Sequence, residues 1–107
     1  MAFDIEWLES AQADFDKEIG YVLAEFGFQV AQDTYSAIYN HIEHIANYPK
    51  IGTKYEKLTY FGYEIRRFPT RQVTIYYSPQ LHKVTILAIW NNRRNPDSLS
   101  RHLLEAQ

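Results

Sequence analysis

The first 27 residues contain two patterns of hydrophobic positions. Phe3, Ile5 and Trp7 alternate with acidic residues, which predicts a strand with one buried face. Ser10 can cap the helix that follows, and apolar residues then recur every three or four positions until Gly27 breaks the pattern. The apolar stripe of this first predicted helix consists of Ala11, Phe15, Ile19, Val22 and Phe26.

A second helical pattern runs from about residue 28 to residue 48. Pro49 and Gly52 end it, since proline and glycine both interrupt helices. Because the link at Gly27 is short, the two helices are expected to form an antiparallel hairpin. The stripe of the second helix consists of Val30, Thr34, Ile38, Ile42 and Ile45.

The region after the helices predicts a polar loop and then three strands. The third strand is apolar almost throughout, which is typical of the buried centre of a sheet. Short turns containing proline separate the strands. The loop carries Lys50, Lys54 and Lys57, and the strand signals lie at residues 62–68, 73–77 and 84–90.

Residues 95–97, Asn-Pro-Asp, predict the start of a last short helix through Leu99 and Leu103. The predicted order is therefore strand, two helices, three strands and helix. This order indicates an α+β fold, with a twisted, mainly antiparallel sheet packed on one face by the helical hairpin. The predicted core residues are Phe15, Ile19, Ile38, Ile42, Ile75, Ile86 and Ala88.

Length and composition narrow the class of protein. The 107 residues are enough for a single domain with one core, and 46% hydrophobic and 16% aromatic content indicates a globular chain. No apolar run is long enough to span a membrane, and the acidic N-terminus does not resemble a signal peptide, so we expect a cytoplasmic protein. The absence of cysteine excludes disulfides and thiolate chemistry.

The histidines do not indicate a metal site. His41 and His44 lie three positions apart on the second helix with Glu43 between them, a spacing that can place two imidazoles near one ion. The sequence offers no evident third ligand. We therefore expect surface histidines and predict neither a metal nor another cofactor.

Charge is divided along the chain. Residues 1–48 hold nine acids and one base, a balance of −8, whereas residues 50–94 hold nine bases and two acids, a balance of +7. Such asymmetry suggests a partner recognised through directional electrostatics. Arginine suits this purpose because its planar fork of donors holds carboxylates and phosphates in two places. The predicted contact residues for a target or partner are Arg66, Arg67, Arg71, Arg93, Arg94 and Lys57.

Several short motifs occur in one order along nearly the whole chain. They are WLESAQADF after the first strand, NYPKIG at the end of the second helix, IRRFP and IYYSP on neighbouring strands, and VTILAIWNNRRNP. In this order and at this spacing they resemble the RelE/ParE superfamily of toxins from type II toxin–antitoxin modules. The resemblance implies a cognate antitoxin as a protein partner.

The resemblance leaves two mechanisms open. RelE-like toxins cut messenger RNA in the ribosome, and the matching positions here are Arg66 and Arg93 or Arg94, with Lys54 and Lys57 where some members carry lysine. Arginine stabilises phosphate but is a poor base, and the usual proton-transfer groups are missing. Asn91 stands where histidine is frequent, and no tyrosine follows Tyr77.

The resemblance therefore favours ParE-like poisoning of DNA gyrase by binding. The alternatives are ribosome-dependent cleavage of messenger RNA and a non-catalytic interaction module. If the protein is a nuclease, we expect Arg66, Arg94, Lys54 and Tyr76 to carry the chemistry. Tyr76 is included because an aromatic ring beside basic side chains can stack on bases.

Overall fold

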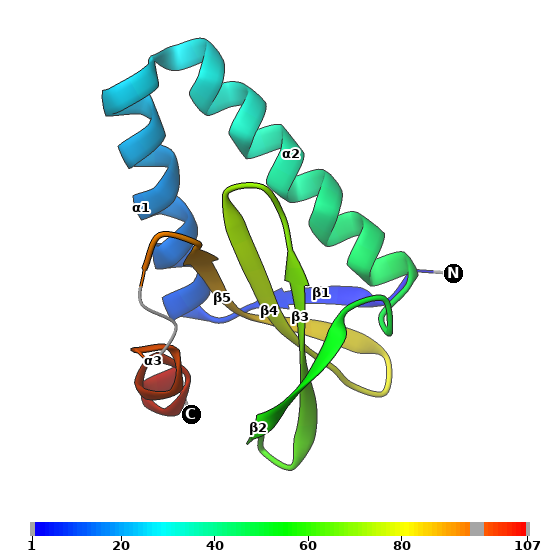
Figure 1. Cartoon of the computed structure of the whole chain (residues 1–107). Coiled ribbons are helices and arrows are strands. Elements are labelled where there is room, and N and C mark those ends of the chain that lie inside the picture. The colour runs from blue at the N-terminus through cyan, green and yellow to red at the C-terminus, as the bar shows by residue number, and fades with distance from the viewer. Residues whose placement is uncertain (1, 95–97, 107) are drawn as a thin grey trace.

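The computed structural model describes residues 2–94 and 98–106. The elements follow in the order β1 (Asp4–Trp7), α1 (Glu9–Phe26), α2 (Phe28–Asn47), β2 (Thr53–Tyr60), β3 (Tyr63–Pro69), β4 (Val73–Pro79), β5 (Lys83–Asn91) and α3 (Leu99–Ala106). The strands form one sheet in the order β1-β5-β4-β3-β2. All neighbours are antiparallel except β1, which pairs in parallel with β5. Figure 1 shows the α1–α2 hairpin beside the sheet and α3 at its opposite side.

The sheet is buried on both faces over its centre. The hairpin face holds the larger cluster, built from Phe15, Ile38 and Ile42 of the helices with Ile75 and Ile86 of the strands. Ile19 packs partly buried against this cluster. The predicted α+β class and the hairpin packed on a mainly antiparallel sheet are thereby confirmed. The second cluster, on the α3 face, contains Ile65, Tyr76, Leu87, Ala88, Trp90, Leu99 and Leu103.

Ala88 is buried, but it belongs to the α3 face and not to the hairpin-side core that the sequence predicted. The cause is a bulge in the β4–β5 pairing. Tyr76 pairs with Ala88 while Tyr77 pairs with Ile86, so Leu87 is an extra residue on β5. A bulge shifts the alternation of side chains by one, which places both Leu87 and Ala88 on the same face.

Strand β2 corrects the prediction of a polar loop and of only three strands after the helices. It pairs with β3 through Lys54–Arg66 and Thr59–Glu64, with a change of register between these pairs. This change of register interrupts the alternation of buried and exposed side chains along β2. The partly buried side chains are consequently Tyr55, Leu58 and Tyr60, which are not spaced two apart throughout. Both Lys54 and Lys57 therefore lie on a strand at the edge of the sheet.

The start of α1 differs from the predicted cap at Ser10. The helix begins at Glu9, Leu8 is its N-cap residue, and no side chain caps it. Leu8 is fixed by other contacts, since its N–H donates to the Ile86 carbonyl and its side chain packs against the core clusters. The chain therefore turns from β1 into α1 two residues earlier than the serine suggests.

The turn of the helical hairpin is a single residue. Gly27 has φ of +89°, and it ends α1 while leading directly into α2. This left-handed backbone region favours glycine. The predicted break at Gly27 is confirmed, but the predicted stripes continue beyond the buried region, since Phe26 is 58% and Val30 40% exposed. The predicted cap at residues 95–97 lies outside the described residues.

Candidate partner-binding site

A loop clamp holds the segment after α2 against the sheet. The Tyr77 hydroxyl donates to the Pro49 carbonyl at 2.8 Å and accepts a hydrogen bond from the Gly52 N–H at 2.9 Å. The Arg66 guanidinium donates to the carbonyls of Lys50 at 3.0 Å and Gly52 at 2.6 Å. The loop clamp consists of these five residues: Pro49, Lys50, Gly52, Arg66 and Tyr77.

Gly52 is required in the loop clamp by close packing. A β-carbon at this position would lie 2.7 Å from both the Arg67 carbonyl oxygen and the Tyr77 hydroxyl. Such distances are shorter than any ordinary contact, so a side chain would push the loop off the sheet. Burial in this environment raises the pKa of Tyr77, although the hydrogen bond from Gly52 and the nearby Arg66 partly oppose the shift.

The loop clamp uses the side chain of Arg66, one of the predicted contact residues. Only 12% of this side chain is exposed, and its guanidinium also lies 3.4 Å from Glu64. Lys54 lies 3.7 Å from the same carboxylate. Arg66 is therefore committed to holding the loop in place, and its charge is balanced within the protein.

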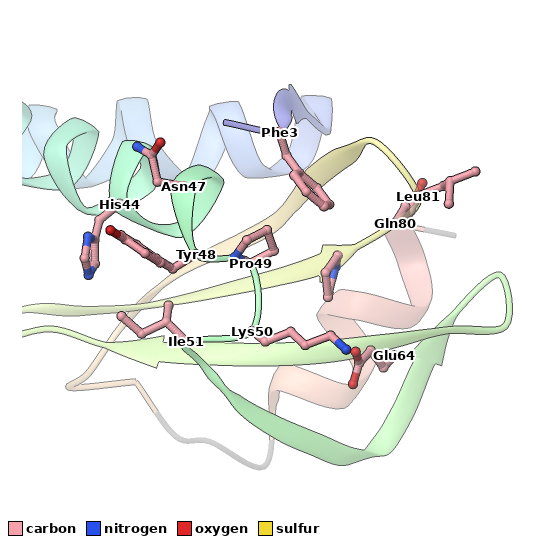
Figure 2. Close-up of a pocket in the computed structure, with 11 residues that line it drawn as sticks. Phe3, His44, Asn47, Tyr48, Pro49, Lys50, Ile51, Glu64, Gln80 and Leu81 are labelled. Atoms are coloured by element: carbon pink, nitrogen blue, oxygen red, sulfur yellow. The ribbon is translucent and has the colours of Figure 1, made fainter. Parts of the chain in front are cut away.

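The fixed loop forms one wall of an apolar groove with a volume of about 940 Å³. Figure 2 shows its side chains coming from the N-terminal segment, the end of α2, the following loop, β3 and the β4–β5 turn. Several of its apolar residues are exposed, with Tyr48 at 61%, Ile51 at 44% and Leu81 at 78%. The groove is lined by Phe3, His44, Asn47, Tyr48, Pro49, Lys50, Ile51, Glu64, Pro79, Gln80 and Leu81.

Arg93 lies where β5 ends, beside α1. Its guanidinium donates to the Tyr21 hydroxyl at 2.7 Å and stacks over the Tyr21 ring at 4.5 Å. Asn91 fixes the backbone there, since its amide donates to Glu18 at 2.8 Å and its oxygen accepts from the Arg93 N–H at 2.8 Å. The asparagine that replaces the family's frequent histidine thus links β5 to α1.

Arg94 lies on the other side of the sheet end. Its guanidinium stacks on Trp90 at 4.0 Å, on the α3 face. Near it, the Asp14 carboxylate accepts a hydrogen bond from the Ile89 N–H at 3.2 Å and contacts His102 at 3.0 Å. Burial raises the pKa of Asp14, and His102 partly opposes this effect. No local sequence pattern indicates the Asp14–His102 pair, because its members are 88 positions apart.

The other predicted contact residues are exposed. Arg67 pairs in register with Tyr76 on the α3 face, while Arg71 lies after β3 and Lys57 on β2. The structure thus divides the predicted arginine surface among both sheet faces and the end of β5. Around the end of β5, however, Arg71 and Arg93 line one hollow, and Arg93 and Arg94 line another.

The four residues expected to act in a nuclease do not share one site. Arg66 and Lys54 are register partners across β2 and β3 and both lie beside Glu64, whereas Tyr76 and Arg94 lie on the α3 face. Arg66 is held in the loop clamp, Lys54 pairs with Glu64, and Arg94 stacks on Trp90. Tyr76 lies on the α3 face with only 4% of its surface exposed. Burial raises the pKa of Tyr76, against a smaller opposing effect of its hydrogen bond with Arg67, so the phenol is a weaker acid than usual.

The described residues contain neither a cluster of metal ligands nor a membrane-spanning helix. No group of three histidine, cysteine, aspartate or glutamate side chains gathers closely enough there to hold a metal ion. His41 and His44 instead contact the ring of Phe68, at centroid distances of 5.5 and 6.4 Å. Within the same ranges, no helix is long and apolar enough to cross a bilayer.

Comparison with known proteins supports both a family and a fold. Residues 5–96 match the family model of the ParE toxin of the type II toxin–antitoxin system parDE. A solved structure of the chromosomal ParDE system from P. aeruginosa has the same fold, with a TM-score of 0.68 and 13% sequence identity. That match covers 84% of this chain and 96% of the other. A search of curated proteins finds no match.

The family match covers most of the chain and includes the loop clamp, the end of β5 and every residue of the apolar groove except Phe3. It also agrees with the resemblance inferred from NYPKIG, IRRFP and IYYSP, whose Gly52, Arg66 and Tyr77 meet in the loop clamp. The chain belongs to the ParE toxin family of type II toxin–antitoxin systems.

Proposed function

We propose that this toxin acts on DNA gyrase by binding it, without cutting a nucleic acid. Membership of the ParE family supports a toxin with a cognate antitoxin, and gyrase is the target that the family resemblance favours. A toxin that acts by binding needs a complementary protein surface but no group that transfers a proton.

The observation that carries the proposal is the separation of Tyr76, on the α3 face, from the neighbouring cations Arg66 and Lys54. Cleavage of RNA through its 2′-hydroxyl requires a phosphate-stabilising cation, a base and an acid around one bond. Arg66 donates to two backbone carbonyls, and the Tyr76 ring is buried on the opposite face. Asn91 neither accepts nor releases a proton and is engaged with Glu18. This arrangement supports binding over cleavage.

We further propose that the antitoxin occupies the apolar groove. Exposed Tyr48, Ile51 and Leu81 offer contact area, and Lys50 lines the same wall. Apolar side chains followed by an acidic group on the antitoxin would match this surface. Arg66 contributes by holding the wall of the groove in place, while Arg67, Arg71 and Lys57 remain the exposed basic residues of the predicted contact set.

The experiment compares two purified activities of the same protein. We expect inhibition of gyrase supercoiling, relieved by the protein encoded beside this gene, and intact messages in a translating extract. In cells, expression without the antitoxin should produce filamentation and DNA damage. Codon-positioned cleavage of message with unaffected supercoiling would refute the proposal and redirect attention to Lys54, Lys57 and Tyr76.

A further inference from the structure

The end of the helical hairpin exposes apolar residues that the fold does not use. All eight residues from 23 to 30, here called the hairpin tip, are exposed. They include Leu23 at 48%, Phe26 at 58%, Phe28 at 71% and Val30 at 40% exposure. A concentration of large apolar side chains on one surface is a common mark of a protein-interaction site.

The hairpin tip is held in a defined shape. Gly27 donates to the Leu23 carbonyl and accepts from the Ala31 N–H, so its backbone closes one helix and opens the next. Phe26 and Phe28 therefore flank a one-residue turn and not a flexible loop. A surface that is ordered before binding loses less entropy when a partner docks. Figure 1 shows this turn projecting beyond the sheet, at the far end of α2 from the loop clamp.

The charge around the hairpin tip identifies the partner's chemistry. From residue 18 to residue 49 the sequence contains Glu18, Glu25, Asp33 and Glu43 but no lysine or arginine. Glu25 and Asp33 are exposed on either side of the turn. Arg71, in the turn after β3, and Arg93, after the end of β5, line a hollow together with Phe26.

We propose that the hairpin tip is the docking surface for the toxin's target, and that it binds an apolar protein surface bordered by lysine or arginine. The inference rests on the proposed function, because it names the surface through which a binding toxin reaches gyrase. Basic groups on the target complement Glu25 and Asp33, while apolar groups cover Phe26 and Phe28. A second copy of the chain fits poorly, since a twofold contact at this turn would bring the acidic residues of both copies together.

The test uses the full-length protein with two substitutions at the tip, Phe26→Ser and Phe28→Ser, in one variant. Phe61→Ser is the matched control, because Phe61 is an aromatic residue at another turn with 66% exposure. Removing central aromatic residues from an interface weakens binding by about 30-fold or more. We expect that loss in gyrase inhibition and in growth arrest for the tip variant, with neither changed in the control.

Two further variants and additional measurements complete the test. Glu25→Lys with Asp33→Lys should also weaken gyrase inhibition, whereas Phe26→Leu with Phe28→Leu should retain most of it. Circular dichroism and thermal melting must show that each variant is folded. Affinity for the protein encoded beside this gene should be unchanged in the tip variant. Size-exclusion chromatography with light scattering should show the same oligomeric state for the tip variant and wild type.

The outcomes separate this inference from the proposed function. If the folded tip variant inhibits gyrase and arrests growth as wild type does, the inference is wrong. If the tip variant instead loses affinity for the antitoxin, or loses self-association, the tip binds the antitoxin or a second copy of the chain. Either result would also overturn the inference. If wild-type protein does not inhibit gyrase, the proposed function fails. In that case growth arrest is the readout for the hairpin tip. Only loss of growth arrest in the tip variant then supports docking of the tip to another target.

Discussion

At both ends of α2, residues have a role opposite to the one that their type suggests. At the C-terminal end, Arg66 and Tyr77 are almost enclosed, and their polar groups bond to the backbone of the following loop. At the N-terminal end, Phe26 and Phe28 are exposed beside a rigid turn. Arginine in a sequence suggests recognition, and phenylalanine suggests a core. Here the arginine stabilises the fold, while the phenylalanines are available to a partner.

The largest predicted difference is in the free energy of unfolding, between substitutions at two residues of the same apolar stripe of α2. Ile42 has 1% exposure, whereas Val30 has 40%. Replacing Ile42 by alanine should lower the free energy of unfolding by about 2–5 kcal/mol, because a cavity opens in the core. Val30→Ala should change it by no more than about 0.5 kcal/mol. Urea denaturation of both variants measures the difference, and a negligible effect at Ile42 would contradict the packing of α2.

Neighbouring arginines on β3 provide the next comparison. Arg66→Ala removes the donor to two loop carbonyls and leaves Glu64 without its closest cation, so we expect a loss of about 1.5–3 kcal/mol. Arg67 is exposed, and Arg67→Ala should cost about 0.5 kcal/mol or less. Equal losses in denaturation experiments would show that the loop clamp does not depend on Arg66.

Two glycines distinguish close packing from free space. Gly52→Ala should cost about 1–3 kcal/mol, because the added methyl group meets the backbone of Arg67 and the ring of Tyr77. Gly20 in α1 has no atom within 4 Å of an added β-carbon, so Gly20→Ala should stabilise the protein by about 0.5–1 kcal/mol. Thermal melting of the two variants should therefore shift in opposite directions.

The smallest effect concerns Tyr77 at high pH. Its pKa in the folded protein is raised by burial, so the folded state keeps a proton that the unfolded chain loses above about pH 10. The stability that this group contributes is therefore present below that pH and falls as pH rises through the folded pKa. The titration of Tyr77 lowers the free energy of unfolding by at most about 1.4 kcal/mol per pH unit. Tyr77→Phe should make the alkaline loss of stability shallower, and an unchanged slope would assign the titration to other tyrosines.

The helices could be predicted because their apolar spacing is regular and Gly27 interrupts it. Strand β2 could not, because its irregular pairing with β3 removes the alternation by which strands are recognised. Ala88 was assigned to the wrong face for a similar reason, since the extra residue Leu87 changes the pattern within β5. In each case the sheet tolerates a local irregularity that a periodic pattern does not reveal.

The sequence indicated which residues matter near the site more reliably than it indicated their roles. Arg66, Gly52 and Tyr77 all lie in short motifs that suggested the family. Their joint role depends on backbone carbonyls of the loop, which no pattern of side chains records. The charge difference between the two halves was likewise visible, but β3 distributes successive arginines to opposite faces.

The parallel pairing of β1 with β5 has a consequence for biosynthesis. Asp4 pairs with Lys83, so β1 has no strand partner until β5 has been translated. The helical hairpin and the antiparallel strands join consecutive segments and can form earlier, whereas this long-range pairing closes last. A nascent chain that stops before residues 83–91 therefore cannot complete the sheet. A ribosome that has not yet made β5 therefore holds a toxin whose sheet is incomplete.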